Sequence, residues 1–123
     1  MNVWLLVAAI NGALAVAAGA FGAHGLQGKI DAHALQVFET GARYQMYHAL
    51  AIGFAAFALR DAAATPATAA AGFFLAGILL FSGSLYLLAL TGTKALGIVT
   101  PFGGVCFLIG WGFLAFAATR LKM

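Results

Sequence analysis

The chain has 123 residues, of which 64% are hydrophobic and only 7% are charged. Soluble domains are about 45–50% apolar and about 25% charged, so a water-soluble core of this size could not bury so much apolar surface, and lipid is the expected solvent. The net charge is +3, but the basic residues mostly flank hydrophobic segments, which predicts contact with lipid headgroups and no nucleic-acid partner.

Four stretches that lack charged residues predict four transmembrane helices, because a hydrocarbon core of about 30 Å needs about 20 helical residues. The first helix is expected at about 3–22. Small residues recur along it at four-residue steps and include Gly12 and Gly19, a pattern that lets helices approach closely in lipid. Asn11 lies near its middle and is expected to face protein, because an unpaired amide in hydrocarbon is costly.

Residues 23–33 are rich in glycine and polar side chains, which predicts a connection. Asp31 is a suitable N-cap for a second helix at about 32–59. In the first turns of this helix, apolar residues recur on one side and polar residues occupy the other. The pattern predicts an amphipathic start in the membrane interface, after which the helix enters the bilayer.

Residues 62–67 predict a short turn before a third helix at about 67–90, with Thr65 as its N-cap. The fourth helix is expected at about 98–118, and Pro101 suits its first turn. Small residues in both helices predict further close packing between helices. The residues expected in these contacts are Gly83, Ser84, Gly103 and Gly104.

The predicted fold is therefore a single all-α transmembrane domain over residues 1–123, a four-helix bundle with both termini on one side. That side would carry Arg60, Arg120 and Lys122, against Lys29, Arg43 and Lys94 on the other, where Arg43 counts less because it is half inside the second helix. Positively charged loops favour the cytoplasm, so both termini are predicted to be cytoplasmic.

One region of the chain, from His24 to His48, concentrates ionisable groups that are otherwise rare in the membrane segments. In one interpretation its role is structural: Glu39 and Arg43, spaced i,i+4, neutralise each other, two tyrosines lie at the headgroups, and His48 bonds to a neighbouring helix. In the other, the region lines a cavity for a small molecule, a lipid or a proton. The candidate residues are His24, Glu39, Arg43, Tyr44, Gln45, Tyr47 and His48.

Motifs for catalysis or metal binding are not found in the sequence. There is no phosphate-binding glycine loop, no HExxH and no GxSxG, and the three histidines lack metal-ligand spacing. The sequence predicts no enzyme, no metal site and no cofactor.

Several short runs of the chain together resemble a known family. They are residues 19–26, 38–41, 44–50, 83–84, 100–104 and 110–111. The resemblance is to small bacterial membrane proteins catalogued as domain of unknown function 423, which are similar to the eukaryotic transmembrane protein 256 group. It implies a multi-pass protein of the bacterial inner (plasma) membrane without an assigned activity. The family's motif falls on His24, Tyr44, Gln45, Tyr47 and His48.

The sequence favours a non-enzymatic interaction protein that self-associates or joins a larger membrane complex. This hypothesis depends on the many small residues, which exceed what one compact bundle needs. The alternative is binding or transport of a small molecule, lipid or proton through the polar region at the start of the second helix.

Overall fold

Four helical rods make up residues 1–122, the part of the chain that the structure, a computed structural model, describes. The first rod is helix α1, Val3–Phe21, which continues as a π-helical turn over Gly22–Leu26. The second rod is helix α2, Ala32–Phe57.

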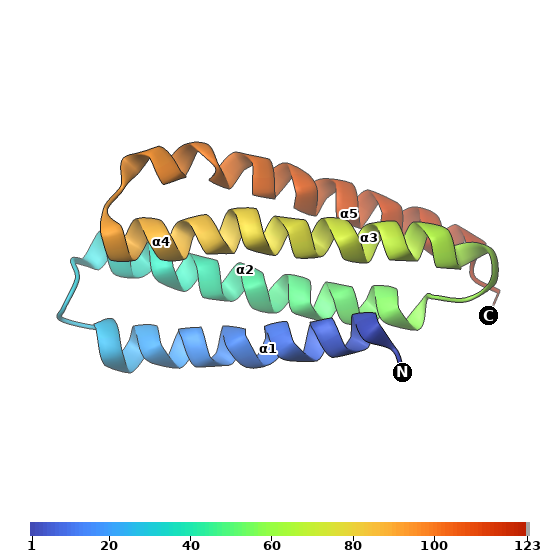
Figure 1. Ribbon diagram of the computed structural model, residues 1–123, viewed down its shortest axis with the longest axis horizontal. Coiled ribbons are helices and arrows are strands. Elements are labelled where there is room, and N and C mark those ends of the chain that lie inside the picture. Colours follow the sequence, from blue (N-terminus) through green and yellow to red (C-terminus); the bar gives the residue numbers. More distant parts are fainter. Residues whose placement is uncertain (123) are drawn as a thin grey trace.

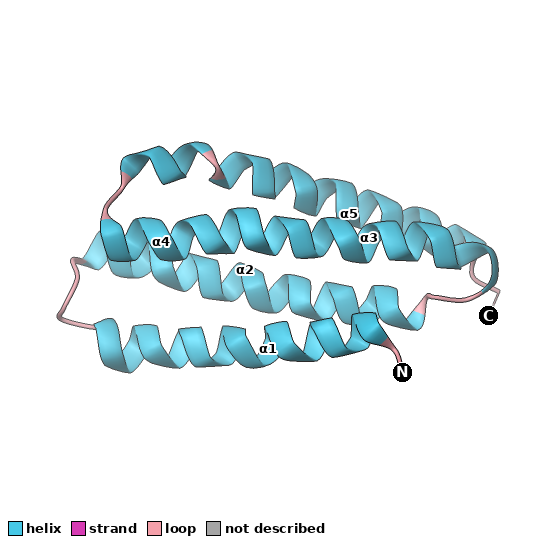
Figure 2. Cartoon of the chain, in the orientation of Figure 1, coloured by secondary structure: helices cyan, strands magenta, loops and turns pink. Residues whose placement is uncertain are grey.

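The third and fourth rods are each composed of several helical segments, and the fourth has a one-residue turn at Val99 (Figure 2). The third contains the 3-10 turn Asp61–Ala63, α3 Ala64–Gly77, the π-helical turn Ile78–Ser82 and α4 Gly83–Thr91, and the fourth contains the 3-10 turn Lys94–Ile98 and α5 Thr100–Arg120.

Local hydrogen bonds set several of the helix ends. The Oδ1 atom of Asn2 accepts the amide N–H of Leu5 (3.0 Å), and Oδ1 of Asp31 accepts the N–H of Ala34 (2.7 Å), so each side chain satisfies an otherwise free donor of a first turn. Helix α4 ends at Thr91 and is followed by Gly92, whose φ of 70° lies in the left-handed region that a residue without Cβ adopts at low cost.

Each rod runs antiparallel to the next one along the chain, and the chain ends lie at the same end of the bundle (Figure 1). Helix α1 packs on α2, α2 packs also on the third rod, and α3 packs on α5. The result is an open arrangement in which α1 has one principal neighbour. Only Ala8, Asn11 and Ala15 of α1 are buried, so most of this helix faces the surroundings.

The core is narrow and consists mainly of alanine around a few large side chains. Phe74 and Ile52 are fully buried, together with small residues such as Ala51, Ala55 and Ala70. Small side chains let the helix axes approach closely, which is how packing is gained where lipid removes the hydrophobic drive between helices.

Glycines produce the closest contact, between the third rod and α5. A Cβ on Gly103 would lie 2.4 Å from the backbone nitrogen of Phe81, and one on Gly77 would lie 2.3 Å from the Phe107 ring. A Cβ on Gly110 would lie 2.7 Å from the ring of Phe74. These three positions require glycine because the neighbouring helix occupies the space of a side chain.

Some predicted boundaries and contacts differ from the structure. The third rod begins at Asp61, not at 67, and Thr65 lies inside its first turns, because Pro66 is tolerated there without ending the helix. The first rod continues to Leu26, where a connection was expected. Gly12, Gly19 and Gly104 were expected in packing contacts, yet a Cβ on any of them would meet nothing within 4 Å.

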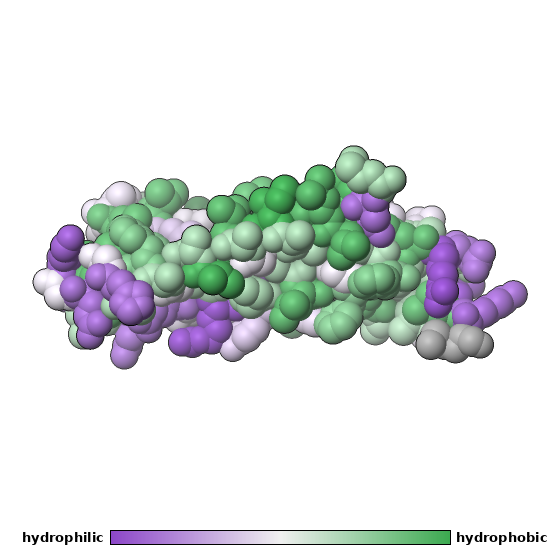
Figure 3. Space-filling model, turned by 90° about the horizontal axis from the view of Figure 1, so that it is seen from below, coloured by the Kyte–Doolittle hydropathy of each residue, from purple (hydrophilic) through white to green (hydrophobic). Residues whose placement is uncertain are grey.

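Three of the rods, Val3–Leu26, Asp61–Thr91 and Lys94–Arg120, are long and apolar enough to cross a membrane. Helix α2 has 26 residues but carries Glu39, Arg43 and further polar side chains. On the surface seen in Figure 3, hydrophobic residues cover the middle of the molecule and hydrophilic residues gather mainly at its ends. This distribution is that of a membrane bundle.

Candidate functional site

His48 lies at the middle level of the bundle. Its ring contacts Phe74, two residues from the centre of the rod Asp61–Thr91, and Phe107, the central residue of Lys94–Arg120. At a helical rise of about 1.5 Å per residue, His48 is therefore within about 3 Å of the midpoint. The polar residues of α2 near His48 would lie deep in a bilayer whose hydrocarbon extends about 15 Å to either side.

A hydrogen-bonded network near this level joins three rods. The amide Nε2 of Gln45 donates to Oδ1 of Asn11 (3.0 Å), and the hydroxyl of Tyr86 donates to Oε1 of Gln45 (2.7 Å). Nδ2 of Asn11 in turn donates to the carbonyl of Val7 (3.0 Å). Asn11 and Gln45 are both buried, so these bonds replace the water that their amides would otherwise need.

Both ring nitrogens of His48 are hydrogen-bonded. The indole Nε1–H of Trp111 donates to Nε2 of His48 (3.1 Å), and Nδ1 of His48 lies 2.8 Å from the carbonyl oxygen of Tyr44. Because an indole N–H can only donate, Nε2 is the acceptor and the proton is on Nδ1. The ring also stacks on Phe107, with centroids 3.5 Å apart and planes 8° apart. His48 is thus a neutral link between α2 and α5.

The other two histidines lie apart from His48. His24 is exposed in the π-helical turn Gly22–Leu26, and His33 is exposed in the first turn of α2. His33 is fifteen residues before His48 on one helix, which is about 22 Å along its axis. The structure therefore does not bring the three imidazoles together.

Glu39 and Arg43 occupy the outer side of α2. Arg43 is exposed and Glu39 is half-buried, and within residues 1–122 they form no ion pair with each other. They precede His48 by nine and five residues, which is about 13 Å and about 7 Å along the helix. Both would therefore lie inside the hydrocarbon layer, at a depth where charged groups are rare without partners.

Tyr44 and Tyr47 do not lie at the level of the headgroups as one interpretation expected. They adjoin His48 in α2 and are therefore close to the middle of the bundle. Tyr47 is 48% exposed and Tyr44 36% exposed, and within residues 1–122 neither hydroxyl has a hydrogen-bond partner. Two donors are thus left unpaired where lipid offers no acceptor.

A groove follows the seam between α1 and α2, and we call it the seam groove. It consists of two adjoining hollows of about 410 Å³ and about 270 Å³. The first includes Gly12 and Gly53, and the second includes Gly19, Glu39 and Arg43. Small residues line most of its length, and the two charged side chains lie at one end.

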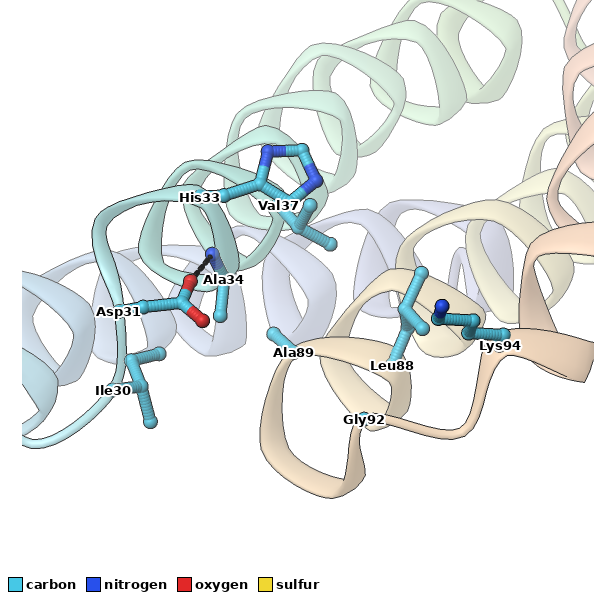
Figure 4. A pocket seen from close by; sticks show the side chains of 9 residues that line it. All are labelled: Ile30, Asp31, His33, Ala34, Val37, Leu88, Ala89, Gly92 and Lys94. Carbon is cyan, nitrogen blue, oxygen red and sulfur yellow. Dashed lines mark hydrogen bonds between the residues drawn. The ribbon is translucent and has the colours of Figure 1, made fainter.

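A larger pocket of about 530 Å³ lies between the start of α2 and the end of α4 (Figure 4). Val37, Leu88 and Ala89 contribute to its apolar part, and Asp31, His33 and Lys94 supply its polar groups. The pocket lies beyond the apolar middle of the bundle, at the level of lipid headgroups.

Sequence reasoning missed two residues of the polar network, Tyr86 and Trp111. Each carries a polar tip on a large apolar body, within a helix that is otherwise apolar. Such residues usually find a hydrogen-bond partner when they are removed from water. Trp111 lies four residues from the centre of the fourth rod, so its depth was an available signal, whereas Tyr86 lies near the end of the third rod. Neither position could indicate the partner on α2.

The helical bundle, its apolar middle and its buried polar network define a multi-pass integral membrane protein. The chain belongs to the family described as protein of unknown function (DUF423), whose model matches residues 18–104. The family resemblance of the sequence is thereby confirmed.

Relatives of the chain are named as membrane proteins and come from several bacteria. UPF0382 membrane protein YwdK of Bacillus subtilis (strain 168) is 48% identical over 121 residues, with 98% of each chain covered. UPF0382 membrane protein SAB0533 of Staphylococcus aureus (strain bovine RF122 / ET3-1) is 47% identical over 120 residues, again with 98% of each covered. A UPF0382 membrane protein of Haemophilus influenzae is 44% identical over 122 residues, which are 98% of this chain and 97% of the relative. No solved structure matches the chain.

Proposed function

We propose that this protein is a non-enzymatic subunit that self-associates in the bacterial plasma membrane by pairing the seam groove of one copy with that of another. The observation that carries the proposal is the position of Arg43. The Cα of Arg43 lies about 7 Å from the level of His48 along the helix, and its side chain is exposed on the outer side of α2. A charge carried by this part of the helix needs a partner, and the chain itself forms no ion pair with it among residues 1–122.

Glu39 is the charge that a second copy would offer. A two-fold axis along the membrane normal would set the same face of two copies against each other, so that Glu39 of each faces Arg43 of the other. In a helix, long side chains point back toward the N-terminus, so Arg43 extends toward the level of Glu39. Two Glu39–Arg43 pairs, related by the two-fold axis, would neutralise all four charges in the interface.

The small residues of the seam groove support the same proposal. Gly12 and Gly19 of α1 have open space where a Cβ would be, so packing within the chain does not explain them. Open glycines along a groove let a second backbone approach closely, which is the common basis of helix association in lipid. Bulky side chains such as Phe54 and Phe57 at the far end would fill the remaining space.

The proposed topology has four crossings and cytoplasmic termini. Helices α1 and α3 run in the same direction along the bundle (Figure 1), and if both cross the membrane then α2 must return between them. The end that carries the termini also carries Arg60, Arg120 and Lys122. The excess of positive charge favours the cytoplasm.

A non-enzymatic role agrees with the use of the buried polar groups. Asn11, Gln45, Tyr86, Trp111 and His48 bond to one another or to backbone. These bonds hold the helices in register. His48 and Trp111 also line a groove, but the indole N–H of Trp111 is already donated to Nε2 of His48.

Disulfide cross-linking in native membranes tests the proposed interface. Gly12→Cys, in a Cys106→Ser background, places a thiol in open space within the seam groove. Ala17→Cys is the control, because Ala17 is exposed on the same helix but does not line the groove. Oxidation should convert most of the Gly12→Cys protein to a covalent dimer, because thiols across a two-fold axis can reach the required Cα separation of about 5.5 Å.

Under the same conditions the Ala17→Cys protein should remain largely monomeric. Equal cross-linking of the two variants would mean random collision in the membrane and would contradict the interface. Cross-linking of Gly12→Cys to a different protein would show that the groove takes another chain.

A further inference from the structure

A second groove lies on the other edge of α2, against α5, and we call it the aromatic groove. Its volume is about 390 Å³, and it opens sideways from the bundle. The groove shares no residue with the seam groove. It is lined by Tyr44, Tyr47, His48, Phe81, Gly104, Phe107, Leu108 and Trp111.

Aromatic rings form the walls of this groove. The rings of Tyr44 and Phe107 are 26° from parallel with centroids 6.3 Å apart, and Tyr44 and Tyr47 have centroids 5.4 Å apart. Trp111 is 42% exposed, and its N–H is already donated to His48, so its indole presents a flat apolar surface. Walls of this kind favour a flat ring, which can stack against them in an offset arrangement.

Gly104 leaves room for such a ring beside α5. It lines the groove, and a Cβ on it would meet nothing within 4 Å. The neighbouring Gly103 has the opposite surroundings, because the backbone of Phe81 fills the space of its side chain. Gly104 thus serves no packing contact within the chain.

Two residues of the groove carry hydrogen-bond donors that have no acceptor among residues 1–122. Within residues 1–122 the hydroxyls of Tyr44 and Tyr47 have no partner, and the ring nitrogens of His48 are both engaged. The groove lies at the middle level of the bundle, where acyl chains offer no acceptor. A ligand that satisfies these hydroxyls must bring acceptor oxygens with it.

We propose that the aromatic groove binds the ring of a lipid-soluble quinone. A quinone is flat, carries two carbonyl acceptors and no donor, and has an apolar tail that can remain in the bilayer while the ring enters the groove from the side. The groove also has a suitable size, because ligand pockets are typically about 300–1,000 Å³ and mostly apolar with few polar groups.

Quenching of tryptophan fluorescence by menaquinone-4 in lipid nanodiscs tests this proposal. The chain has two tryptophans, and a Trp4→Phe background leaves Trp111 in the groove wall as the only reporter. Menaquinone-4 should quench it saturably. An analogue with the same tail on 2-methylnaphthalene lacks the carbonyl groups, and it is added as a competitor. After subtraction of the emission that the analogue gives without protein, it should not restore the fluorescence quenched by menaquinone-4.

Three variants in the Trp4→Phe background distinguish binding in the groove from general partition of menaquinone-4 into the lipid. Gly104→Leu fills the groove and should weaken binding at least about tenfold. Tyr47→Phe removes one hydroxyl from an exposed side chain and should weaken binding about fivefold, the usual effect of one hydrogen bond. Gly112→Leu is the matched control, because Gly112 is equally open but does not line the groove, and its affinity should be unchanged.

Displacement of menaquinone-4 by an equal concentration of the analogue without carbonyls would overturn the proposal. Equal affinity of the Gly104→Leu and Tyr47→Phe variants to the parent protein would also overturn it. Neither result bears on self-association, because the seam groove uses other residues. The cross-linking of Gly12→Cys therefore remains an independent test of the proposed function.

Discussion

Adding one methyl group at Gly103 should separate two helices, whereas the same change at Gly104 should not. A Cβ on Gly103 would lie 2.4 Å from the nitrogen and 2.8 Å from the Cα of Phe81. These are backbone atoms, so no side-chain rotation relieves the contact. The third rod and α5 would have to move apart by roughly 1 Å to restore ordinary van der Waals distances.

The cost follows from the packing around this contact. Overpacking of a close contact usually costs about 1–3 kcal/mol, and the better helix propensity of alanine returns up to about 1 kcal/mol. The separation would also loosen the nearby contact of Gly77 with Phe107. We therefore expect Gly103→Ala to lower the free energy of unfolding by about 2 kcal/mol, and Gly104→Ala to leave it unchanged or raise it slightly.

Reversible unfolding in mixed micelles, with SDS as the denaturant and tryptophan fluorescence as the signal, measures this difference. The two variants differ only in which of two adjacent glycines gains the methyl group, so effects on insertion and on helix propensity cancel. Unfolding free energies that agree within about 0.5 kcal/mol would refute the close approach of the two rods at Gly103.

The buried hydroxyls allow two further predictions by the same assay. Tyr86→Phe should lower the free energy of unfolding by about 0.6–1.7 kcal/mol, because it leaves Oε1 of Gln45 without its donor in the interior of a membrane protein; an unchanged value would show that this bond contributes nothing. Ser82→Ala should be neutral or stabilising, because the Ser82 hydroxyl is fully buried and has no hydrogen-bond partner among residues 1–122. Ser84→Ala should instead destabilise by about 1 kcal/mol, because the Ser84 hydroxyl lies 2.6 Å from the hydroxyl of Thr100. The reverse order of these two serine variants would contradict the assignment of partners.

Local chemistry made several parts of the fold predictable. Asp31 was expected to cap the second helix, and α2 begins at the next residue, Ala32. Pro101 was expected in a first turn, and α5 begins at Thr100. In each case the decisive interaction lies within four residues, so the sequence alone contains it.

The predicted start of the third helix, at about residue 67, was wrong for a physical reason. Pro66, with the alanines and threonine before it, was interpreted as a turn, but proline interrupts a helix only beyond its first turn. The 3-10 turn Asp61–Ala63 therefore leads directly into α3, which begins at Ala64 and includes Pro66 in its first turn. The polar residues of α2 near His48 lie at the middle level of the bundle, because His48 contacts Phe74 and Phe107.

The partners in the site depend on contacts between distant parts of the chain. His48 bonds to Trp111, which is 63 residues away, and Gln45 bonds to Tyr86, 41 residues away. Helical periodicity shows which residues share a face of one helix, but it does not show which neighbouring helix meets that face. Periodicity likewise could not show which glycines pack against a neighbouring helix. Gly103 and Gly104 are adjacent in sequence and have opposite surroundings.

Charge reversal with mixing tests self-association through the seam groove most directly. Glu39→Arg would place two positive charges on the outer side of α2, and Arg43→Glu would place two negative ones. Capture of one tagged copy and detection of a second, differently tagged copy from the same membranes measures pairing. We predict that the native protein pairs with itself, that neither variant alone does so, and that the two variants expressed together recover the pairing. Self-pairing of either variant at the native level, or no recovery on mixing, would contradict an interface made by Glu39 and Arg43.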